Sequence, residues 1–206
     1  MSRERATALL VDFDGVLRRW DPAVAAGVER EYGLTEGVLG EIAMSWGLLQ
    51  PVLTGRVSHA EWMSSVAEAL TPTVGDPVRA RAAVDEWQRY RGEVDPDVLA
   101  FVREARAAGI RVGLGTNATD LLDADLAALG LTGELDVVVN SSVVGVHKPA
   151  KEYFQAACAA LDTPPGRVLF VDDQDRAVAG ARVAGLSAHR WSGPADLRYL
   201  RAALAR

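Results

Sequence analysis

The sequence predicts an α/β fold, in which a doubly wound, mainly parallel sheet carries an inserted helical domain. Short β-rich apolar runs are found at 7–13, 110–115, 135–140, 167–173 and 186–191. Segments with apolar residues at helical spacing separate the later runs. Strands that alternate with helices favour a parallel sheet covered by helices. Runs such as VVV and VLFV are typical of strands that are buried on both faces.

The gap between the first and second runs is far longer than one crossover needs, and its pattern predicts several helices. Helical spacing is found in PAVAAGVEREYG, around EGVLGEIAMSW, in SHAEWMSSVAEAL and in DPVRARAAVDEWQRYR. Ser58 and Glu61 form a capping-box pattern at the start of the third of these segments. We therefore expect a helical insert at 18–91, within a core that is formed by 1–17 and 92–206.

The overall composition is that of an ordinary globular protein. The 206 residues are 49% hydrophobic and 24% charged, enough for one sizeable core and an additional unit. The net charge of -6 comes without a basic stripe, so we expect no nucleic-acid partner. No apolar stretch approaches the ~18 residues that span a bilayer, and the first residues lack a signal-peptide pattern. We expect a cytoplasmic protein with no membrane partner, and leave its oligomeric state open between monomer and dimer.

Polar residues follow four of the predicted strands, at the edge where ligands bind to parallel sheets. They are Asp12 and Asp14 after the first run, Thr116 and Asn117 after the second, Lys148 shortly after the third, and Asp172 and Asp173 at the end of the fourth. Residues two apart in an extended segment face the same way, so Asp12 and Asp14 can converge on one site. Each acidic pair alone is equally typical of a turn or a helix cap. Four such strand ends together indicate one functional site.

The charges of this group favour a bound cation. Four carboxylates at neighbouring strand ends repel one another, which either raises a pKa or holds a hard cation through oxygen ligands. The four acids and Lys148 sum to a charge of -3, and Mg²⁺ would bring the sum to -1. Thr116 offers a hydroxyl and Asn117 an amide. Acids, a metal, such donors and a lysine are the groups that handle phosphoryl transfer.

The ordered motifs DFDGVL, TN, HKP…F and FVDDQ resemble those of the haloacid dehalogenase-like superfamily of hydrolases, and they cover nearly all of the predicted core. The resemblance implies a Rossmann-like core, and the insert resembles the C1-type cap of these proteins. It also implies a Mg²⁺-dependent phosphatase. Such an enzyme would hydrolyse a small phosphorylated metabolite, a phosphate monoester such as a sugar phosphate, through an aspartyl-phosphate intermediate.

The resemblance assigns roles to the polar residues. Asp12 would be the nucleophile, and Asp14 would protonate the leaving group and then deprotonate the attacking water. The implied phosphate-binding residues are Thr116, Asn117 and Lys148. The implied metal ligands are Asp12, the backbone carbonyl of Asp14, and Asp173, with Asp172 nearby. The dehalogenases of the superfamily lack an acid two residues after the nucleophile, so Asp14 favours phosphoryl transfer.

One position departs from the pattern of these relatives. They usually carry Asp or Asn four residues after the metal-binding Asp173, where this chain has Ala177. Asp175 or Gln174 could take over the support that the missing polar side chain gives. The departure keeps a catalytically silent, phosphate-binding relative as one alternative function.

Three further alternatives stay open at this stage. The segment GLGTNA, 113–118, fits a dinucleotide-binding pattern, but the following strand lacks the acid that this pattern expects at its end. A phospho-acceptor signalling module would use similar acids, but it has no need of a helical insert. A phosphosugar mutase or another phosphotransferase would share the phosphatase chemistry and pass the phosphoryl group to another acceptor.

The insert is expected to select the substrate. It contains four tryptophans: Trp20, Trp46, Trp62 and Trp87. The spacing of Trp62, Val66 and Leu70 predicts packing between helices of the insert. Arg18 and Arg19 either face the substrate or form an exposed hinge. His59, at a helix start, is expected on the surface.

Overall fold

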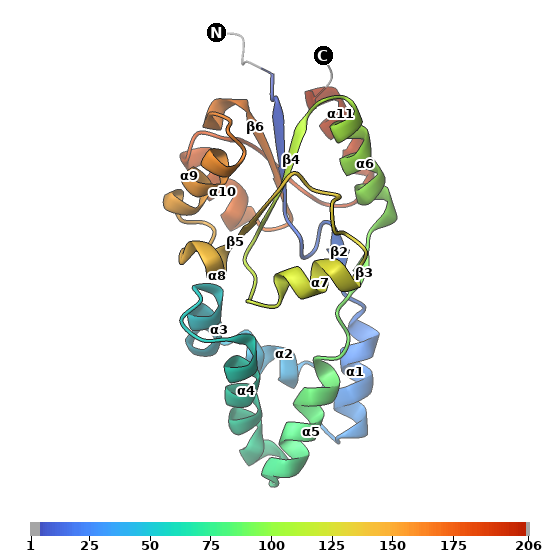
Figure 1. Ribbon diagram of the computed structural model, residues 1–206. Helices are drawn as coiled ribbons and strands as arrows, with labels where there is room; N and C mark the ends of the chain where they lie inside the picture. Colours follow the sequence, from blue (N-terminus) through green and yellow to red (C-terminus); the bar gives the residue numbers. More distant parts are fainter. Residues whose placement is uncertain (1–4, 205–206) are drawn as a thin grey trace.

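The computed structural model describes residues 5–204 and confirms the predicted α/β fold (Figure 1). Its central sheet comprises β1 (Ala8–Val11), β4 (Arg111–Thr116), β5 (Val137–Asn140), β6 (Val168–Asp172) and β7 (Ser187–Arg190). All four strand pairs are parallel, in the order β5-β4-β1-β6-β7. The chain first adds strands on one side of β1 and then on the other. The direction therefore switches between β1 and β6, which is where ligands bind to such sheets.

Helices cover both faces of the sheet, as the buried strands required. They are α6 (Pro96–Ala107), α7 (Leu122–Ala128), α8 (Ser141–Val144), α9 (Lys151–Ala160), α10 (Asp175–Val183) and α11 (Leu197–Leu204). In β1, Leu9 and Val11 pack with α6, α7 and α11 on one face, whereas Ala8 and Leu10 pack with α9 and α10 on the other. Alternate residues of a strand point to opposite faces, so this one buried strand joins two hydrophobic clusters.

Five further helices lie together at one end of the molecule. They are α1 (Pro22–Glu31), α2 (Val38–Ala43), α3 (Trp46–Leu53), α4 (His59–Val74) and α5 (Pro77–Trp87). They bury a hydrophobic cluster of their own, in which Trp62, Val66 and Leu70 pack as their spacing predicted. The capping box of Ser58 and Glu61 is also confirmed at the start of α4. These helices therefore have a core that is separate from the sheet.

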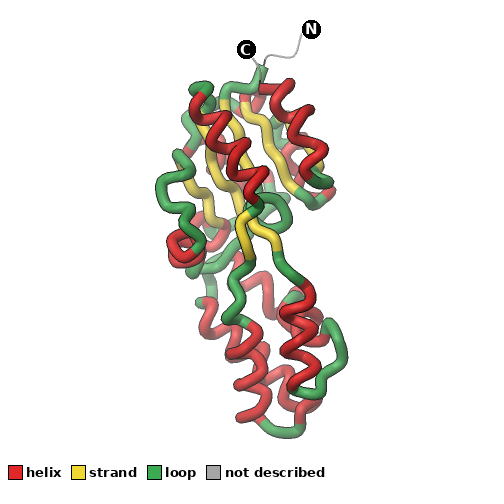
Figure 2. Tube along the Cα trace, turned by 90° about the vertical axis from the view of Figure 1, so that its right-hand side faces the viewer, coloured by secondary structure: helices red, strands yellow, loops and turns green. Residues whose placement is uncertain are grey.

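A short two-stranded ribbon connects the helices to the sheet domain (Figure 2). β2 (Arg18–Arg19) pairs antiparallel with β3 (Glu93–Val94), so the chain leaves and re-enters the sheet domain at one place. We call the segment between β2 and β3 the insert. The exact boundaries that the sequence suggested for it, at 18 and 91, stay predictions.

One difference from the sequence-based expectation concerns the insert. The segment around EGVLGEIAMSW is two helices, because α2 ends at Ala43 and α3 begins at Trp46. The α3 helix escaped prediction because it contains Pro51, which in a sequence is typical of a break.

The insert is docked on the sheet domain by specific contacts. The Asp120 carboxylate, just before α7, accepts a hydrogen bond of 2.7 Å from the backbone N–H of His59 at the start of α4. Gly55 approaches the backbone of Ser142 so closely that a Cβ at this position would overlap the Ser142 carbonyl.

Within residues 5–204, no helix is long and apolar enough to cross a membrane.

Two helical glycines provide a test of the packing beside the site. A Cβ on Gly180 in α10 would lie 2.5 Å from the carbonyl oxygen of Pro149, whereas one on Gly27 in α1 would meet nothing within 4 Å. We expect Gly180→Ala to lower the free energy of unfolding by about 1–3 kcal/mol through overpacking. Gly27→Ala should raise it by about 0.5–1 kcal/mol, because alanine favours the helix. Urea denaturation of both variants measures this, and a stabilised Gly180→Ala protein would contradict the described contact.

Candidate active site

The predicted polar residues meet where the strands end. Asp12 follows β1 directly, and its backbone N–H bonds the carbonyl of Val171 at 2.9 Å. Asp172 is the last residue of β6, and Thr116 is the last residue of β4. Three neighbouring strands thus bring their carboxyl ends to one point. The sequence predicted that these residues meet at the strand ends, and the strand order places that point at the switch of direction.

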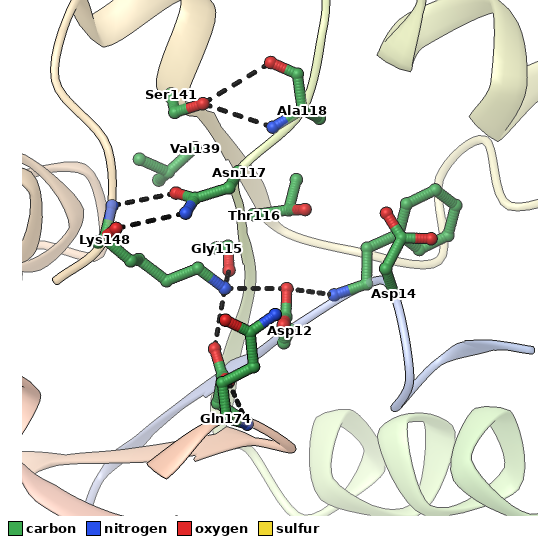
Figure 3. Close-up of polar contacts among 12 residues, drawn as sticks. Asp12, Asp14, Gly115, Thr116, Asn117, Ala118, Val139, Ser141, Lys148 and Gln174 are labelled. Atoms are coloured by element: carbon green, nitrogen blue, oxygen red, sulfur yellow. Dashed lines mark hydrogen bonds and ion pairs between the residues drawn. The ribbon is translucent and has the colours of Figure 1, made fainter. Parts of the chain in front are cut away.

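Lys148 stands at the centre of this group. Its ammonium lies 2.7 Å from Oδ1 of Asp12 and 2.7 Å from Oδ2 of Asp172, and it donates to the carbonyl of Gly115 at 3.0 Å. Figure 3 shows the Lys148 side chain reaching toward Asp12 and Gly115. Lys148, Asp12 and Asp172 are all buried. A charge can be buried in this way only because it is paired and hydrogen-bonded.

Burial and charge pairing act against each other on these pKa values. Burial raises the pKa of Asp12 well above its usual value and Lys148 opposes this effect, while the neighbouring Asp172 adds to it. Burial lowers the pKa of Lys148, but Asp12 and Asp172 outweigh burial and raise it. Lys148 therefore keeps its proton at neutral pH. A metal ion beside Asp12 would favour the carboxylate form in the same way as Lys148 does.

Asn117 positions Lys148 through the backbone. Its Oδ1 accepts from the Lys148 backbone N–H at 2.8 Å, and its Nδ2 donates to the Lys148 carbonyl at 3.1 Å (Figure 3). Both ends of the amide are thus occupied. Thr116 is buried beside it at the end of β4. The phosphate-binding roles expected for Thr116 and Asn117 stay predictions.

Three of the four acids form a group that could hold a metal ion. Asp12, Asp172 and Asp173 each offer a carboxylate oxygen, and these oxygens lie within 4.8 Å of one another. Oδ1 of Asp12 accepts from both Lys148 and the Phe13 N–H, and Asp172 is bonded by Lys148 and by the Gln174 N–H. Oδ1 of Asp173 is buried without a hydrogen-bond partner among the described residues.

The neighbourhood of Asp173 fits a cation. Burial and the charge of Asp172 raise the pKa of Asp173, and a cation would relieve both effects. Gly15 approaches this carboxylate so closely that a Cβ would lie 2.7 Å from its carboxyl carbon. Gly15 also has a φ of 81°, in the left-handed region that glycine tolerates best. The turn after β1 is therefore shaped around the Asp173 carboxylate.

The residues near Ala177 show what the departure at this position changes. Ala177 is buried in the cluster beneath α9 and α10, and its methyl group offers no oxygen ligand. Asp175 is largely exposed and pairs with Arg190 at 3.1 Å, so it does not replace a polar residue at 177. Gln174 lines the same cavity as Lys148 and Ala177. Of the two substitutes that the sequence suggested, Gln174 is the one that the geometry favours.

Asp14 faces away from the Lys148 group. Its carboxylate accepts from Arg18 Nε at 2.7 Å, from Arg18 Nη2 at 3.0 Å and from Trp20 Nε1 at 2.6 Å. It is not one of the three acids whose oxygens cluster. The expected convergence of the Asp12 and Asp14 side chains is therefore not seen in this conformation. The chain turns at Gly15, so the alternation of an extended strand ends before Asp14.

Arg18 joins Asp14 to the sheet domain. It is buried, its guanidinium stacks 4.1 Å from the ring centroid of Phe13, and its Nη1 donates to Asp125 in α7 at 2.9 Å. Arg91, on the other side of the ribbon, bonds the same Asp125 through Nε at 2.8 Å and Nη2 at 2.6 Å. Of the two expectations for Arg18, an exposed hinge is excluded, whereas Arg19 is exposed.

Asp125 was not predicted from the sequence, and the prediction that His59 lies on the surface is wrong. Asp125 lies three residues after the buried Leu122, on the face of α7 that should be apolar, and this was the available signal. His59 is buried, not exposed, because the segment before α7 covers the start of α4. Its Nε2 lies 3.1 Å from Oε1 of Gln88, and burial lowers the pKa of its imidazole.

A cavity of about 550 Å³ lies between the insert and the sheet domain. Asp14, Asn117, Lys148 and Gln174 line it from the sheet domain, and the insert contributes all four of its tryptophans. A second hollow of about 730 Å³, between the start of α4 and the edge strand β5, includes none of the predicted site residues. Of the two, only the first cavity is lined by predicted site residues, although the second hollow is larger.

Comparison with known proteins decides the family. A family model of haloacid dehalogenase-like hydrolases matches residues 6–185. The chain belongs to this hydrolase family. A phosphatase of Mycobacterium tuberculosis is 31% identical over 192 residues, which are 89% of this hydrolase and 86% of that protein.

Two further similarities are to a phosphatase and to a dehalogenase. A plasmid-encoded phosphoglycolate phosphatase of Cupriavidus necator is 30% identical, over 87% of this chain and 78% of its own. The solved structure of the L-2-haloacid dehalogenase of Xanthobacter autotrophicus is 27% identical, with a TM-score of 0.66 over 96% of this chain and 83% of that chain. The expected superfamily is thereby confirmed.

The approach of Gly15 to Asp173 predicts a specific loss in a Gly15→Ala variant. We expect Mg²⁺ to raise the melting temperature of the unchanged protein. In the variant the added Cβ must displace the Asp173 carboxylate, so this expected rise should shrink or vanish. Gly133→Ala is the matched control, because Gly133 has the same φ of about 80° and open space around its Cα. Backbone strain should cost both variants about 1–2 kcal/mol of stability. An equal Mg²⁺ response in the two variants would show that Asp173 does not depend on Gly15.

Proposed function

We propose that this hydrolase is a Mg²⁺-dependent phosphatase that cleaves a small phosphate monoester through an aspartyl-phosphate on Asp12. The observation that carries the proposal is the position of Asp12. Its carboxylate is paired with the Lys148 ammonium and stands at the switch point of the sheet. It lies beside Oδ1 of Asp173, which has no hydrogen-bond partner within residues 5–204. A nucleophile, a fixed positive charge and a cation-binding oxygen thus meet at one place.

Asp12 supplies the nucleophilic oxygen. It attacks phosphorus and forms an O–P bond while the ester bond breaks and the electron pair leaves with the alkoxide. Water then attacks the phosphorus of the aspartyl-phosphate, the O–P bond to Asp12 breaks, and inorganic phosphate is released. One difficult displacement is thereby divided into two easier ones.

Asp14 moves the protons in both steps. It gives a proton to the departing alkoxide and later takes one from the attacking water, so each turnover restores its protonation state. In the described conformation its oxygens accept hydrogen bonds from Arg18 and Trp20. For the first step the carboxyl must be protonated and turned toward the substrate.

The phosphoryl group meets a prepared electrostatic environment. Lys148 is held by Asn117 and by Gly115, so its charge is fixed before a substrate arrives. Asp12, Asp173 and the carbonyl of Asp14 would hold Mg²⁺, with Asp172 directed at Lys148. When bound, Mg²⁺ supplies Lewis-acid polarisation of a phosphoryl oxygen.

Asp14 also separates this proposal from dehalogenation. The similarity to a haloacid dehalogenase concerns the fold and the nucleophile, and dehalogenases have no use for a second acid that protonates an alkoxide. The two curated relatives named above are both phosphatases. Phosphoryl transfer accounts for Asp12, Asp14 and Asp173 together.

Hydrolysis of p-nitrophenyl phosphate tests the proposal. We expect Mg²⁺-dependent release that excess EDTA abolishes, and a loss of about 1,000-fold or more in Asp12→Asn, because the nucleophile is removed. Asp97→Asn is the control, since Asp97 is an exposed carboxylate in the first turn of α6. A thermal melt of Asp12→Asn shows whether the fold is intact. Activity that persists in this variant or in EDTA would refute the proposed mechanism.

A further inference from the structure

The insert lines its side of the cavity mainly with apolar side chains. Apolar and aromatic side chains form it: Trp20, Val24, Met44, Trp46, Leu49, Leu53, Trp62, Met63, Trp87 and Tyr90. Trp46 and Met44 are 56% and 53% exposed, which is unusual for such large apolar side chains. Exposed apolar surface that is gathered in a cavity, rather than scattered, marks a binding site.

The polar groups on this side of the cavity are already bonded to one another. Arg18 is bonded to Asp14 and Asp125, and Arg91 is bonded to Asp125 through two nitrogens. His59 and Gln88 form a contact of 3.1 Å with each other. Each of these groups would have to give up a present partner in order to bind a hydroxyl or carboxylate of a substrate. Such an exchange gains little binding energy.

The groups without such partners lie on the other side of the cavity. Gln174 and Arg176, at the start of α10, line it from the sheet domain, where Lys148 and Ala177 also lie. Among the described residues, neither side chain has a hydrogen bond or ion pair. Both belong to the sheet domain, and Gln174 follows directly after Asp173 of the acidic group.

From this division we infer the class of substrate: a phosphate monoester whose leaving group is a bulky apolar or aromatic alcohol, bound against Trp46 and Met44. The inference rests on the proposed phosphatase function. The inferred substrate differs from the sugar phosphate that the sequence suggested, because sugar hydroxyls would be buried against apolar side chains without hydrogen-bond partners. It also departs from small carboxylated esters, because Arg18 and Arg91 are already occupied by carboxylates.

Trp46 closes the cavity from the insert side. Its ring makes an edge contact with the His147 ring of the sheet domain, with centroids 5.3 Å apart and an interplanar angle of 81°. An aromatic leaving group that enters here can make the same kind of edge or offset contact with Trp46. Met44, with an adaptable thioether side chain, extends the wall.

Three primary-alcohol esters test the inference, because their leaving groups differ in polarity while the reaction stays the same. The measurement is kcat/KM with Mg²⁺ for benzyl phosphate, phosphoglycolate and glucose 6-phosphate. We expect benzyl phosphate to exceed each of the others by about tenfold or more. Trp46→Ala and Met44→Ala should lower kcat/KM for benzyl phosphate by about tenfold, mainly through KM, and leave phosphoglycolate within about twofold.

Tyr199→Ala is the matched control, because Tyr199 in α11 is 54% exposed and lies outside the cavity. It should change none of the three values. A higher kcat/KM for glucose 6-phosphate than for benzyl phosphate would overturn the inferred class. So would a higher kcat/KM for phosphoglycolate that falls in Arg176→Ala. An equal loss on all substrates in Trp46→Ala and Met44→Ala would also overturn it, since these residues would then support closure only. No hydrolysis of any ester, p-nitrophenyl phosphate included, would instead refute the proposed function itself.

Discussion

The site depends on one buried ammonium group. Lys148 Nζ is the atom at which β1, β4 and β6 are tied together, through Asp12, the Gly115 carbonyl and Asp172. Without that charge, two buried carboxylates would face each other, and breaking such a buried pair typically costs about 3–5 kcal/mol. The Asn117 side chain then fixes the loop that carries Lys148, because it bonds both the backbone N–H and the backbone carbonyl of Lys148. The electrostatics that a phosphoryl group would meet are therefore part of what holds the strand ends together.

A second charge network connects the insert to the same strand end. Asp125 in α7 accepts hydrogen bonds from Arg18, which lies in the two-stranded ribbon, and from Arg91, which precedes β3. Arg18 also donates a hydrogen bond to Asp14. The four charges cancel, so the network can be buried with little net cost from charge repulsion. The side chain proposed to move protons is thus anchored to the point where the insert joins the sheet domain, and any rotation of the ribbon would change its partners.

The sequence predicted whatever depends on local pattern or on the parallel direction of the strands. Five strands, the capping box at Ser58 and the meeting of Asp12, Lys148 and Asp172 followed from apolar runs and from the common edge of a parallel sheet. Contacts between distant segments could not be predicted in this way. His59 is buried only because Asp120, far along the chain, covers the start of α4. Asp14 faces Arg18 because the backbone turns at Gly15, which the alternation of an ideal strand does not describe.

The apolar side chains of the insert can strengthen the electrostatic interactions of the sheet domain by excluding water. A leaving group that covers Trp46 and Met44 displaces water from the cavity, and a drier cavity has a lower effective dielectric constant. The attraction between the Lys148 ammonium and the charge that develops on the phosphoryl oxygens then becomes stronger. A substrate with a small polar leaving group would leave water in the same space and weaken that attraction. Selection by the insert and catalysis by the strand ends would therefore be two results of one event, the exclusion of water from the space between them.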